Sequence, residues 1–291
     1  MVQQSVSAVS RRDFVRSTGA MLGAACCGQL CADDKKNDAY GSFTVGAQSY
    51  CFRNFDREQA LKKIQALGLR YVEFYQKHAP LESTPEQIQA ILRMCKDYDV
   101  TPIAYGVQNF GKNHDANKKT YDFGKTLGIK YFSADPDPDS FDSLDKLCEE
   151  YKIGIAIHPH GPAGGGKLHR WYCAEAIMDA VKNHNPLIGS CLDTGHLIRA
   201  AQLGKKLDPA QQVRVMGARN FGMHMKDHDN DRKTDVVYGK GVLDVPEVLK
   251  ALKEVNFHGW ISIEYEAHAD NPSPDMEACL QVLRDAVKKV S

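Results

Sequence analysis

LIGSCLDTGH, residues 187–196, is an apolar β-rich run that ends in charged and polar residues, and this pattern decides the fold. Seven more runs of the same kind occur along the chain, separated by stretches with helical character. Short strands that alternate with helices indicate a parallel sheet. The eight runs are FTVGAQSY (43–50), RYVEFY (70–75), VTPIAYGV (100–107), IKYFSA (129–134), IGIAIH (153–158), LIGSCLD (187–193), NFGMHMK (220–226) and WISIEYE (260–266).

Helical stretches follow each of these runs. In the stretch 245–255, apolar residues recur at helical spacing, and Asp244 stands before it as a capping residue. The expected helices span 57–67, 84–98, 117–127, 140–151, 171–182, 209–218, 245–255 and 274–290.

The size of this repeating region favours a closed barrel. About 250 residues remain after residue 40, which is the usual size of a (β/α)8 barrel. A doubly wound open sheet is the alternative, and it normally carries a glycine-rich phosphate loop after its first strand. That position reads SYCFRNFD (49–56), without a GxGxxG motif. We therefore predict an α/β fold, a single (β/α)8 TIM barrel domain over residues 41–291.

The first forty residues differ in composition from the rest. The segment SRRDFVR (10–16) closely resembles the twin-arginine export signal of bacteria, and an apolar stretch rich in small residues, 20–32, follows it. We expect residues 1–40 to be a signal peptide and linker that is cleaved near Ala32, and the mature chain to be periplasmic. An amphipathic N-terminal helix and a lipoprotein-type cut before Cys26 are the alternatives.

Charge and cysteine content exclude several classes of protein. Lys plus Arg and Asp plus Glu both number 37, so the formal net charge is zero, which argues against a nucleic-acid or polybasic membrane-surface protein. No run of 18 apolar residues indicates a transmembrane helix. Six of the nine cysteines lie outside the expected leader, widely spaced and without a Cys-x-x-Cys pair, so neither a disulfide framework nor a cysteine-type zinc site is expected.

Polar residues gather where the predicted strands end. In a (β/α)8 barrel the active face is formed at the carboxyl ends of the strands. Charged side chains on the helix-facing side of a strand would be costly to bury, so we expect them to point into the mouth of the barrel. The residues at these ends are Glu73, His158, His160, Asp193, His196, His224, Lys226, Glu264 and Glu266.

Four of these residues form a candidate metal site. His158, Asp193, His224 and Glu264 come from four successive predicted strands and should converge. Two imidazoles and two carboxylates without a thiolate suit one divalent ion such as Mn, Zn, Co, Fe or Ni. A single histidine at a strand end is more often a hydrogen-bonded structural group, but four such residues on successive strands weaken that reading.

Five short motifs carry a resemblance to a known family. They are YVEF (71–74), LDTGH (192–196), HMKD (224–227), YGKGVLD (238–244) and IEY (263–265). In this order the chain resembles, over residues 43–290, the sugar phosphate isomerase/epimerase superfamily of xylose isomerase-like TIM barrels. The resemblance implies a sugar isomerase or epimerase of carbohydrate metabolism with one divalent metal held by His158, Asp193, His224 and Glu264. It also implies that the metal polarises a substrate carbonyl and stabilises an enediolate.

One position departs from the family pattern. Epimerases and keto-sugar isomerases usually have glutamate at the end of the fifth strand, where this chain has His158. In those enzymes two glutamates move a proton on opposite faces of the sugar. Loss of one glutamate favours a reaction with a single base, so a keto-sugar hydratase or dehydratase, a lyase similar to inosose dehydratases, is the alternative to isomerisation or epimerisation.

The expected chemistry assigns a role to each remaining residue. Glu264 or Glu73 removes a proton from a keto-sugar or polyol. His160 and Lys226 assist catalysis. His196, Glu266 and Tyr75 bind substrate, and Trp171 is expected in the core.

Other classes of protein remain as rivals. A DNA-repair enzyme of the endonuclease IV type shares DTGH (193–196) but needs three metals, for which the ends of the third and fourth strands lack the histidines. A sugar-binding protein without catalytic activity is a further alternative. The glycine-rich segment 160–167 has the form of a mobile lid. No feature decides whether the chain forms a homo-oligomer.

Overall fold

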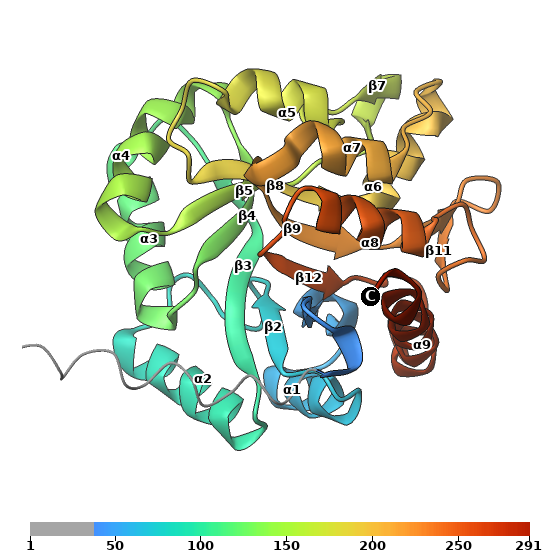
Figure 1. Ribbon diagram of the computed structural model, residues 1–291. Helices are drawn as coiled ribbons and strands as arrows, with labels where there is room; N and C mark the ends of the chain where they lie inside the picture. Colours follow the sequence, from blue (N-terminus) through green and yellow to red (C-terminus); the bar gives the residue numbers. More distant parts are fainter. Residues whose placement is uncertain (1–37) are drawn as a thin grey trace, which may run out of the picture. The chain divides into compact units, whose positions relative to one another are not determined.

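A computed structural model describes residues 38–291, which form a closed barrel of parallel strands surrounded by helices (Figure 1). β1 pairs with β2 on one side and with β12 on the other, so the sheet has no free edge and the open-sheet alternative is excluded. The predicted (β/α)8 TIM barrel is confirmed. Its strands are β1 (Thr44–Gln48), β2 (Tyr71–Phe74), β3 (Thr101–Phe110), β4 (Tyr131–Pro136), β5 (Gly154–Ile157), β8 (Ile188–Asp193), β9 (Asn220–Met225) and β12 (Trp260–Ile263).

The outer helices follow the predicted positions within a few residues. α3 begins three residues before its predicted start because Asn113 caps it and accepts a hydrogen bond from the backbone of Ala116. The α-helices are α1 (Arg57–Ala66), α2 (Pro85–Asp97), α3 (His114–Leu127), α4 (Phe141–Tyr151), α5 (Ala174–Val181), α6 (Thr194–Arg199), α7 (Pro209–Met216), α8 (Val245–Glu254) and α9 (Ser273–Val290). Short 3-10 helices are η1 (Asp38–Tyr40), η2 (Ser49–Phe52), η3 (Pro138–Ser140), η4 (Gly164–Gly166), η5 (Ala200–Leu203) and η6 (Gly217–Arg219).

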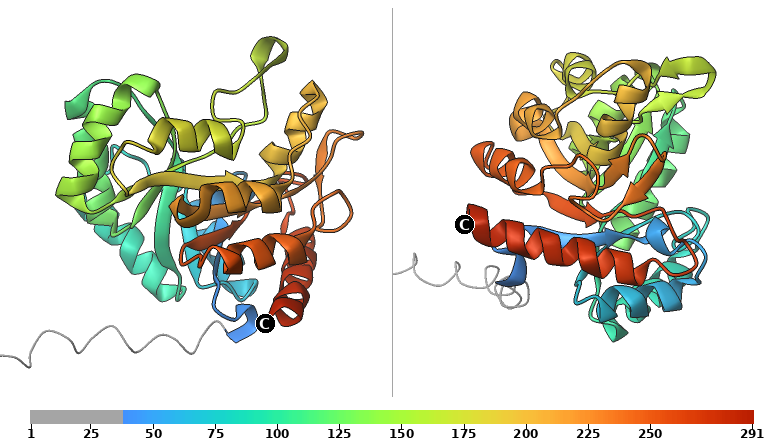
Figure 2. Two further views of the ribbon diagram at one scale, coloured as in Figure 1. Left: turned by 45° about the horizontal axis from the view of Figure 1, so that its top comes forward. Right: turned by 90° about the vertical axis from the view of Figure 1, so that its right-hand side faces the viewer.

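One helix and two hairpins at the carboxyl ends of the strands were not predicted. α6 follows β8 directly, and the hairpins β6–β7 (Pro162–Ala163, Lys167–Leu168) and β10–β11 (Asp227–Asp229, Thr234–Val236) follow β5 and β9. Both hairpins extend from the barrel beside α6 in Figure 2. The predicted lid therefore contains a short antiparallel hairpin with glycines at its tip, and its mobility stays a prediction.

Apolar side chains fill the barrel from its amino-terminal end. Tyr131 stacks on Phe221 and on Trp260, with ring centroids 5.2 and 5.3 Å apart, and this group closes the floor of the barrel. The main core lies between the strands and the outer helices. It includes Trp171, as predicted, which packs edge-on against Phe141 and donates its indole N–H to the carbonyl of Pro136 at 3.0 Å.

The described cysteines are all buried and free, and all six belong to the region after the expected leader. Among residues 38–291, no helix is both long and apolar enough to cross a membrane. The signal peptide predicted for residues 1–40 lies outside the described residues except for its last three positions.

Candidate metal centre

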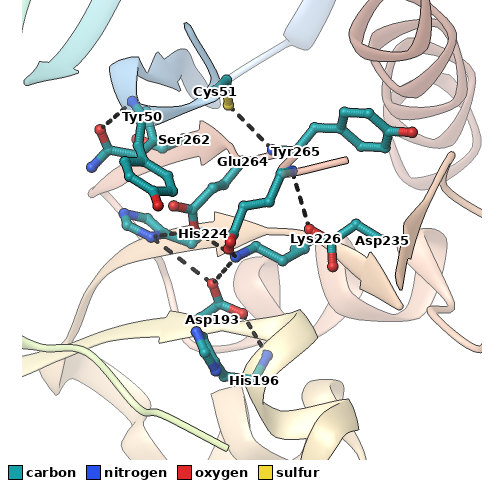
Figure 3. A network of polar contacts seen from close by, with 12 residues as sticks. Tyr50, Cys51, Asp193, His196, His224, Lys226, Asp235, Ser262, Glu264 and Tyr265 are labelled. Carbon is teal, nitrogen blue, oxygen red and sulfur yellow. Dashed lines mark hydrogen bonds and ion pairs between the residues drawn. The ribbon is translucent and has the colours of Figure 1, made fainter. Parts of the chain in front are cut away.

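The four predicted metal ligands meet inside the mouth of the barrel. His158 follows β5, Asp193 ends β8, His224 lies in β9, and Glu264 follows β12; all four are buried. One possible ligand atom from each lies within 4.8 Å of the others. His158 Nε2 is 3.0 Å from His224 Nδ1 and 3.4 Å from Asp193 Oδ2, and His224 Nδ1 is 3.1 Å from Glu264 Oε2. Figure 3 shows Asp193, His224 and Glu264 pointing toward one another from neighbouring strands.

The atoms that face this point have the chemistry of metal ligands. Asp193 Oδ1 accepts a hydrogen bond from the backbone of His196 at 2.6 Å, whereas Asp193 Oδ2 is buried without a hydrogen-bond partner. Its nearest polar neighbours are His158 Nε2 and Lys226 Nζ, each at 3.4 Å, so the oxygen keeps room for an ion, a water or a ligand. Two imidazoles and two carboxylates with such an oxygen among them fit a divalent cation.

Glu73 lies beneath His224, toward the floor of the barrel. It accepts hydrogen bonds from His224 Nε2 at 2.8 Å, from Trp260 Nε1 at 2.9 Å, from Ser262 Oγ at 2.7 Å and from Ser133 Oγ. Burial by itself would raise the pKa of the Glu73 carboxyl, but His224 and these donors outweigh it and lower the pKa to about 2. Glu73 is fully buried with every bond directed into the barrel, and it therefore holds His224 with Nδ1 turned toward the other ligands.

The motif DTGH (193–196) builds the start of α6 as well as the centre. Asp193 caps the helix through His196 N, and Thr194 Oγ1 accepts from the backbone of Lys226 at 2.8 Å and donates to its carbonyl at 2.7 Å. A side chain at position 195 would place its Cβ 2.6 Å from Lys226 Cδ. Gly195 is therefore required for Lys226 to pass beneath α6.

Lys226 places a buried ammonium group among three carboxylates. Its Nζ lies 3.0 Å from Glu264 Oε2, 3.4 Å from Asp193 Oδ2, and in contact with Glu266 Oε1. Burial alone would lower the pKa of this ammonium, but the carboxylates outweigh burial and raise the pKa well above its usual value. Lys226 is consequently a fixed positive charge beside the centre, suited to stabilising negative charge on an oxygen.

His160 and His196 lie next to His158 on the same side of the mouth. The rings of His158 and His160 are 4.8 Å apart between centroids, and His196 is 5.4 Å from His158 and 5.0 Å from His160. Burial lowers the pKa of His160 to about 3 and lowers the pKa of His196 well below its usual value, so both rings are neutral at neutral pH.

Asp227 organises a loop that the sequence analysis matched only as a motif. Its carboxylate accepts backbone hydrogen bonds from Gly239, Gly241, Val242 and Leu243 at 2.9–3.1 Å, and from His228 at 2.9 Å. This explains why HMKD and YGKGVLD occur together, because the aspartate of the first motif binds the backbone of the second. The closely spaced glycines of YGKGVLD were the signal that could have revealed this contact.

The other two predicted substrate residues lie at the rim. Glu266 pairs with Lys226, and its backbone N–H donates to Asp235 at 3.1 Å. Tyr75 packs edge-on against the exposed ring of Tyr50, 5.3 Å between centroids, and its hydroxyl donates to the carbonyl of Arg53 at 3.4 Å. Tyr75 therefore stands outside the group of four ligands, and Tyr50 is a rim residue that sequence reasoning missed.

Comparison with known proteins supplies the family. The family model described as xylose isomerase-like TIM barrel matches residues 61–286. A solved structure of an uncharacterized protein from Parabacteroides distasonis is 27% identical, with a TM-score of 0.65, and the match covers 86% of this chain and all of that one. No curated protein matches the chain significantly.

Two sugar epimerases have the same fold. The D-psicose 3-epimerase of Clostridium cellulolyticum has a TM-score of 0.62 at 15% identity, with 85% of this chain and 99% of that chain covered. The 3-keto-D-glucoside 4-epimerase of E. coli has a TM-score of 0.61 at 14% identity, with 85% and 98% covered. The family match spans most of the barrel, and the chain belongs to the xylose isomerase-like TIM barrel family.

Proposed function

We propose that this protein is a divalent-metal-dependent sugar isomerase or epimerase that acts on a keto-sugar or polyol. The observation that carries the proposal is the convergence of His158, Asp193, His224 and Glu264, with ligand atoms within 4.8 Å of one another. The family, together with the two sugar epimerases of the same fold, supports the substrate class. His158 Nε2, Asp193 Oδ2, His224 Nδ1 and Glu264 Oε2 would hold the ion.

The bound ion, Glu264 and Lys226 would each have a different role in the reaction. A bound divalent cation would supply a Lewis acid that polarises a substrate carbonyl and binds a neighbouring hydroxyl. Glu264, which at 7% is the most exposed of the four, would take the proton from the carbon beside the carbonyl. The ammonium of Lys226 would stabilise the negative charge that develops on the enediolate oxygen.

Hydration or dehydration is the second candidate reaction, and the position of Glu73 favours it. Proton transfer on both faces of a sugar requires a second base at the mouth, but Glu73 is buried beneath His224 with its oxygens bonded to four donors. A single base at Glu264 suits a reaction in which the enediolate expels a hydroxyl group. We keep isomerisation or epimerisation as the first proposal because the enzymes of known activity cited above are epimerases.

An activity screen in heavy water tests the proposal and separates the two reactions. The full chain is stripped with a chelator, reloaded with Mn²⁺, Zn²⁺, Co²⁺, Fe²⁺ or Ni²⁺, and incubated with free keto-sugars, polyols and 3-keto-glycosides. Isomerisation or epimerisation predicts a new isomer with deuterium beside the carbonyl by NMR, and dehydration predicts a product lighter by one water. Asp179→Asn, on the exposed face of α5, is the control that should behave as the parent.

Two outcomes of the screen would contradict the proposal. Turnover that is equal in the stripped and the reloaded protein would exclude metal dependence. Binding of a sugar without conversion of any compound would indicate the sugar-binding protein that remains as a rival.

We also propose that the chain is exported by the twin-arginine route and works in the periplasm. The support is the segment SRRDFVR (10–16) with the small apolar residues after it.

A further inference from the structure

Three imidazoles form a second polar group directly beside the metal centre. One ring nitrogen from each of His158, His160 and His196 lies within 4.8 Å of the others. Two nitrogens of this group, Nδ1 of His158 and Nδ1 of His160, are buried and have no hydrogen-bond partner. His158 as a whole is only 2% exposed. A buried nitrogen without a partner calls for an occupant that can bond with it, and two such nitrogens belong to rings whose centroids are 4.8 Å apart.

The backbone determines which nitrogen of His196 carries the proton. The N–H of Gly161 donates to His196 Nδ1 at 3.0 Å, so Nδ1 offers a lone pair there. A neutral imidazole has one N–H, and it must be at Nε2. A Cβ at position 161 would lie 3.0 Å from the carbonyl oxygen of His196 and 2.9 Å from Arg199 Cβ, so the close approach that allows this bond requires glycine.

The metal centre determines the proton on His158. Its Nε2 faces His224 Nδ1 at 3.0 Å and Asp193 Oδ2 at 3.4 Å, where a metal ligand needs a free lone pair. The proton is then on Nδ1, which points away from the four ligands and is one of the two unpartnered nitrogens. This step rests on the proposed function, since it takes His158 Nε2 as a ligand.

These two assignments define the occupant. His158 Nδ1–H and His196 Nε2–H are two donors, and His160 Nδ1 can accept. A hydroxyl or water oxygen accepts two hydrogen bonds and donates one, which is the complement of this arrangement. A second metal ion is disfavoured because two N–H groups would face it.

The space between the rings admits one atom. Three nitrogens at most 4.8 Å apart leave a point no more than about 2.8 Å from each, which suits a hydrogen-bonded oxygen and also a metal ion, so the choice between the two rests on the N–H groups assigned above. We propose that His158, His160 and His196 bind one hydroxyl oxygen of the substrate next to the metal centre, and hold a water molecule there when no substrate is bound. In a dehydration, this site would receive the expelled hydroxyl group.

The group of Asp135, His160 and His169 does not compete with this assignment. His169 Nδ1 accepts from the backbone N–H of Trp171 at 3.3 Å, so its own proton is on Nε2, which faces Asp135 Oδ2 at 3.3 Å. His169 is thus a donor to Asp135 and not a free ligand.

A crystal structure of the metal-loaded, substrate-free full chain is the direct test, with water as the probe. We expect one ordered oxygen within about 3.2 Å of a nitrogen of all three rings. His160→Asn places an amide oxygen near the position of Nδ1 and should keep this water, whereas His160→Phe should lose it. Long-range ¹H–¹⁵N NMR of histidine-labelled protein should show His196 protonated on Nε2 and His158 on Nδ1.

Metal counting separates this inference from the proposed function. The parent, His160→Asn and His196→Gln should each hold one divalent ion per chain, and Asp193→Ala should hold none. A second ion that is lost in the His160 and His196 variants would overturn the hydroxyl site, as would an empty space between the rings. An Asp193→Ala variant that keeps its ion would contradict the metal centre instead.

Discussion

Glu73 and His224 form the contact on which the orientation of the centre depends. The carboxylate binds His224 Nε2, and the opposite nitrogen faces His158, Asp193 and Glu264. The sequence predicted both residues at strand ends. It assigned Glu73 a catalytic role because alternation along a strand places a side chain inside the barrel without giving its depth. The depth depends on Ser133, Ser262 and Trp260, which lie on other strands.

The depth of Glu73 leads to a test of its role. Glu73→Gln should weaken metal binding by roughly 10- to 100-fold, because the acceptor that orients His224 is altered and the other donors lose a carboxylate partner. Metal affinity is measured by competition with a chromophoric chelator, with thermal unfolding as the control for folding. If the variant binds metal as the parent does and only its kcat falls, Glu73 acts as a base.

The elements that position the site were predicted unequally. The eight barrel strands and their helices carry apolar periodicity over enough residues to be read from the sequence, as in β8 and α8. α6 has six residues, fewer than two turns, so it shows no period of its own. In the hairpin β10–β11, Asp227 pairs with Val236, and most of the residues in both strands are polar. The hairpin therefore lacks the alternation of apolar and polar residues by which a strand is recognised in a sequence.

The loop after β11 provides a prediction for one element. Asp227→Ala should lower the free energy of unfolding by at least about 3 kcal/mol, because five backbone N–H groups lose their acceptor. Urea denaturation measures the loss, and hydrogen exchange should show new exposure at residues 239–243. A change below about 0.5 kcal/mol would mean that water replaces the carboxylate without cost.

The segment between β2 and α2 predicts a dependence of stability on pH. His78 is buried, its Nε2 bonds to the carbonyl of Phe55 at 3.1 Å, and burial lowers the pKa of the ring to about 4. Between about pH 6.5 and pH 4, His78 is protonated in the unfolded chain but neutral in the folded chain. The free energy of unfolding therefore decreases as the pH falls through this range.

His78→Gln keeps a donor for Phe55 and removes the titration. Between pH 7 and pH 5 the parent should therefore lose about 2 kcal/mol more unfolding free energy than the variant. Urea titrations of both proteins at the two pH values measure this difference. Equal losses would show that His78 titrates normally in the folded protein.

At the scale of the whole molecule, the barrel brings together residues as distant in sequence as Glu73 and Glu264. Closure of the sheet between β1 and β12 makes this possible, and the count of strand–helix units predicted that closure. The segment SRRDFVR (10–16) and the composition around it assigned residues 1–40 to a separate role, as a signal peptide and linker. A signal peptide acts in the newly made chain, before it is cleaved.

Export depends on the paired arginines if the leader is a twin-arginine signal. Replacing Arg11 and Arg12 with lysine keeps the charge, so it should abolish export only where the pair itself is recognised. Fractionation of cells that express the parent and the double variant measures the periplasmic share. Unchanged export of the double variant would contradict the twin-arginine assignment.

The metal content of the full chain tests the central claim most directly. Elemental analysis after purification and reloading should find one divalent ion per chain in the parent and in the surface control Asp179→Asn. Asp193→Ala should lose the ion, because Asp193 Oδ2 is the buried oxygen without a hydrogen-bond partner at the centre. An Asp193→Ala protein that binds the ion with parental affinity, or a parent that binds none, would contradict the account.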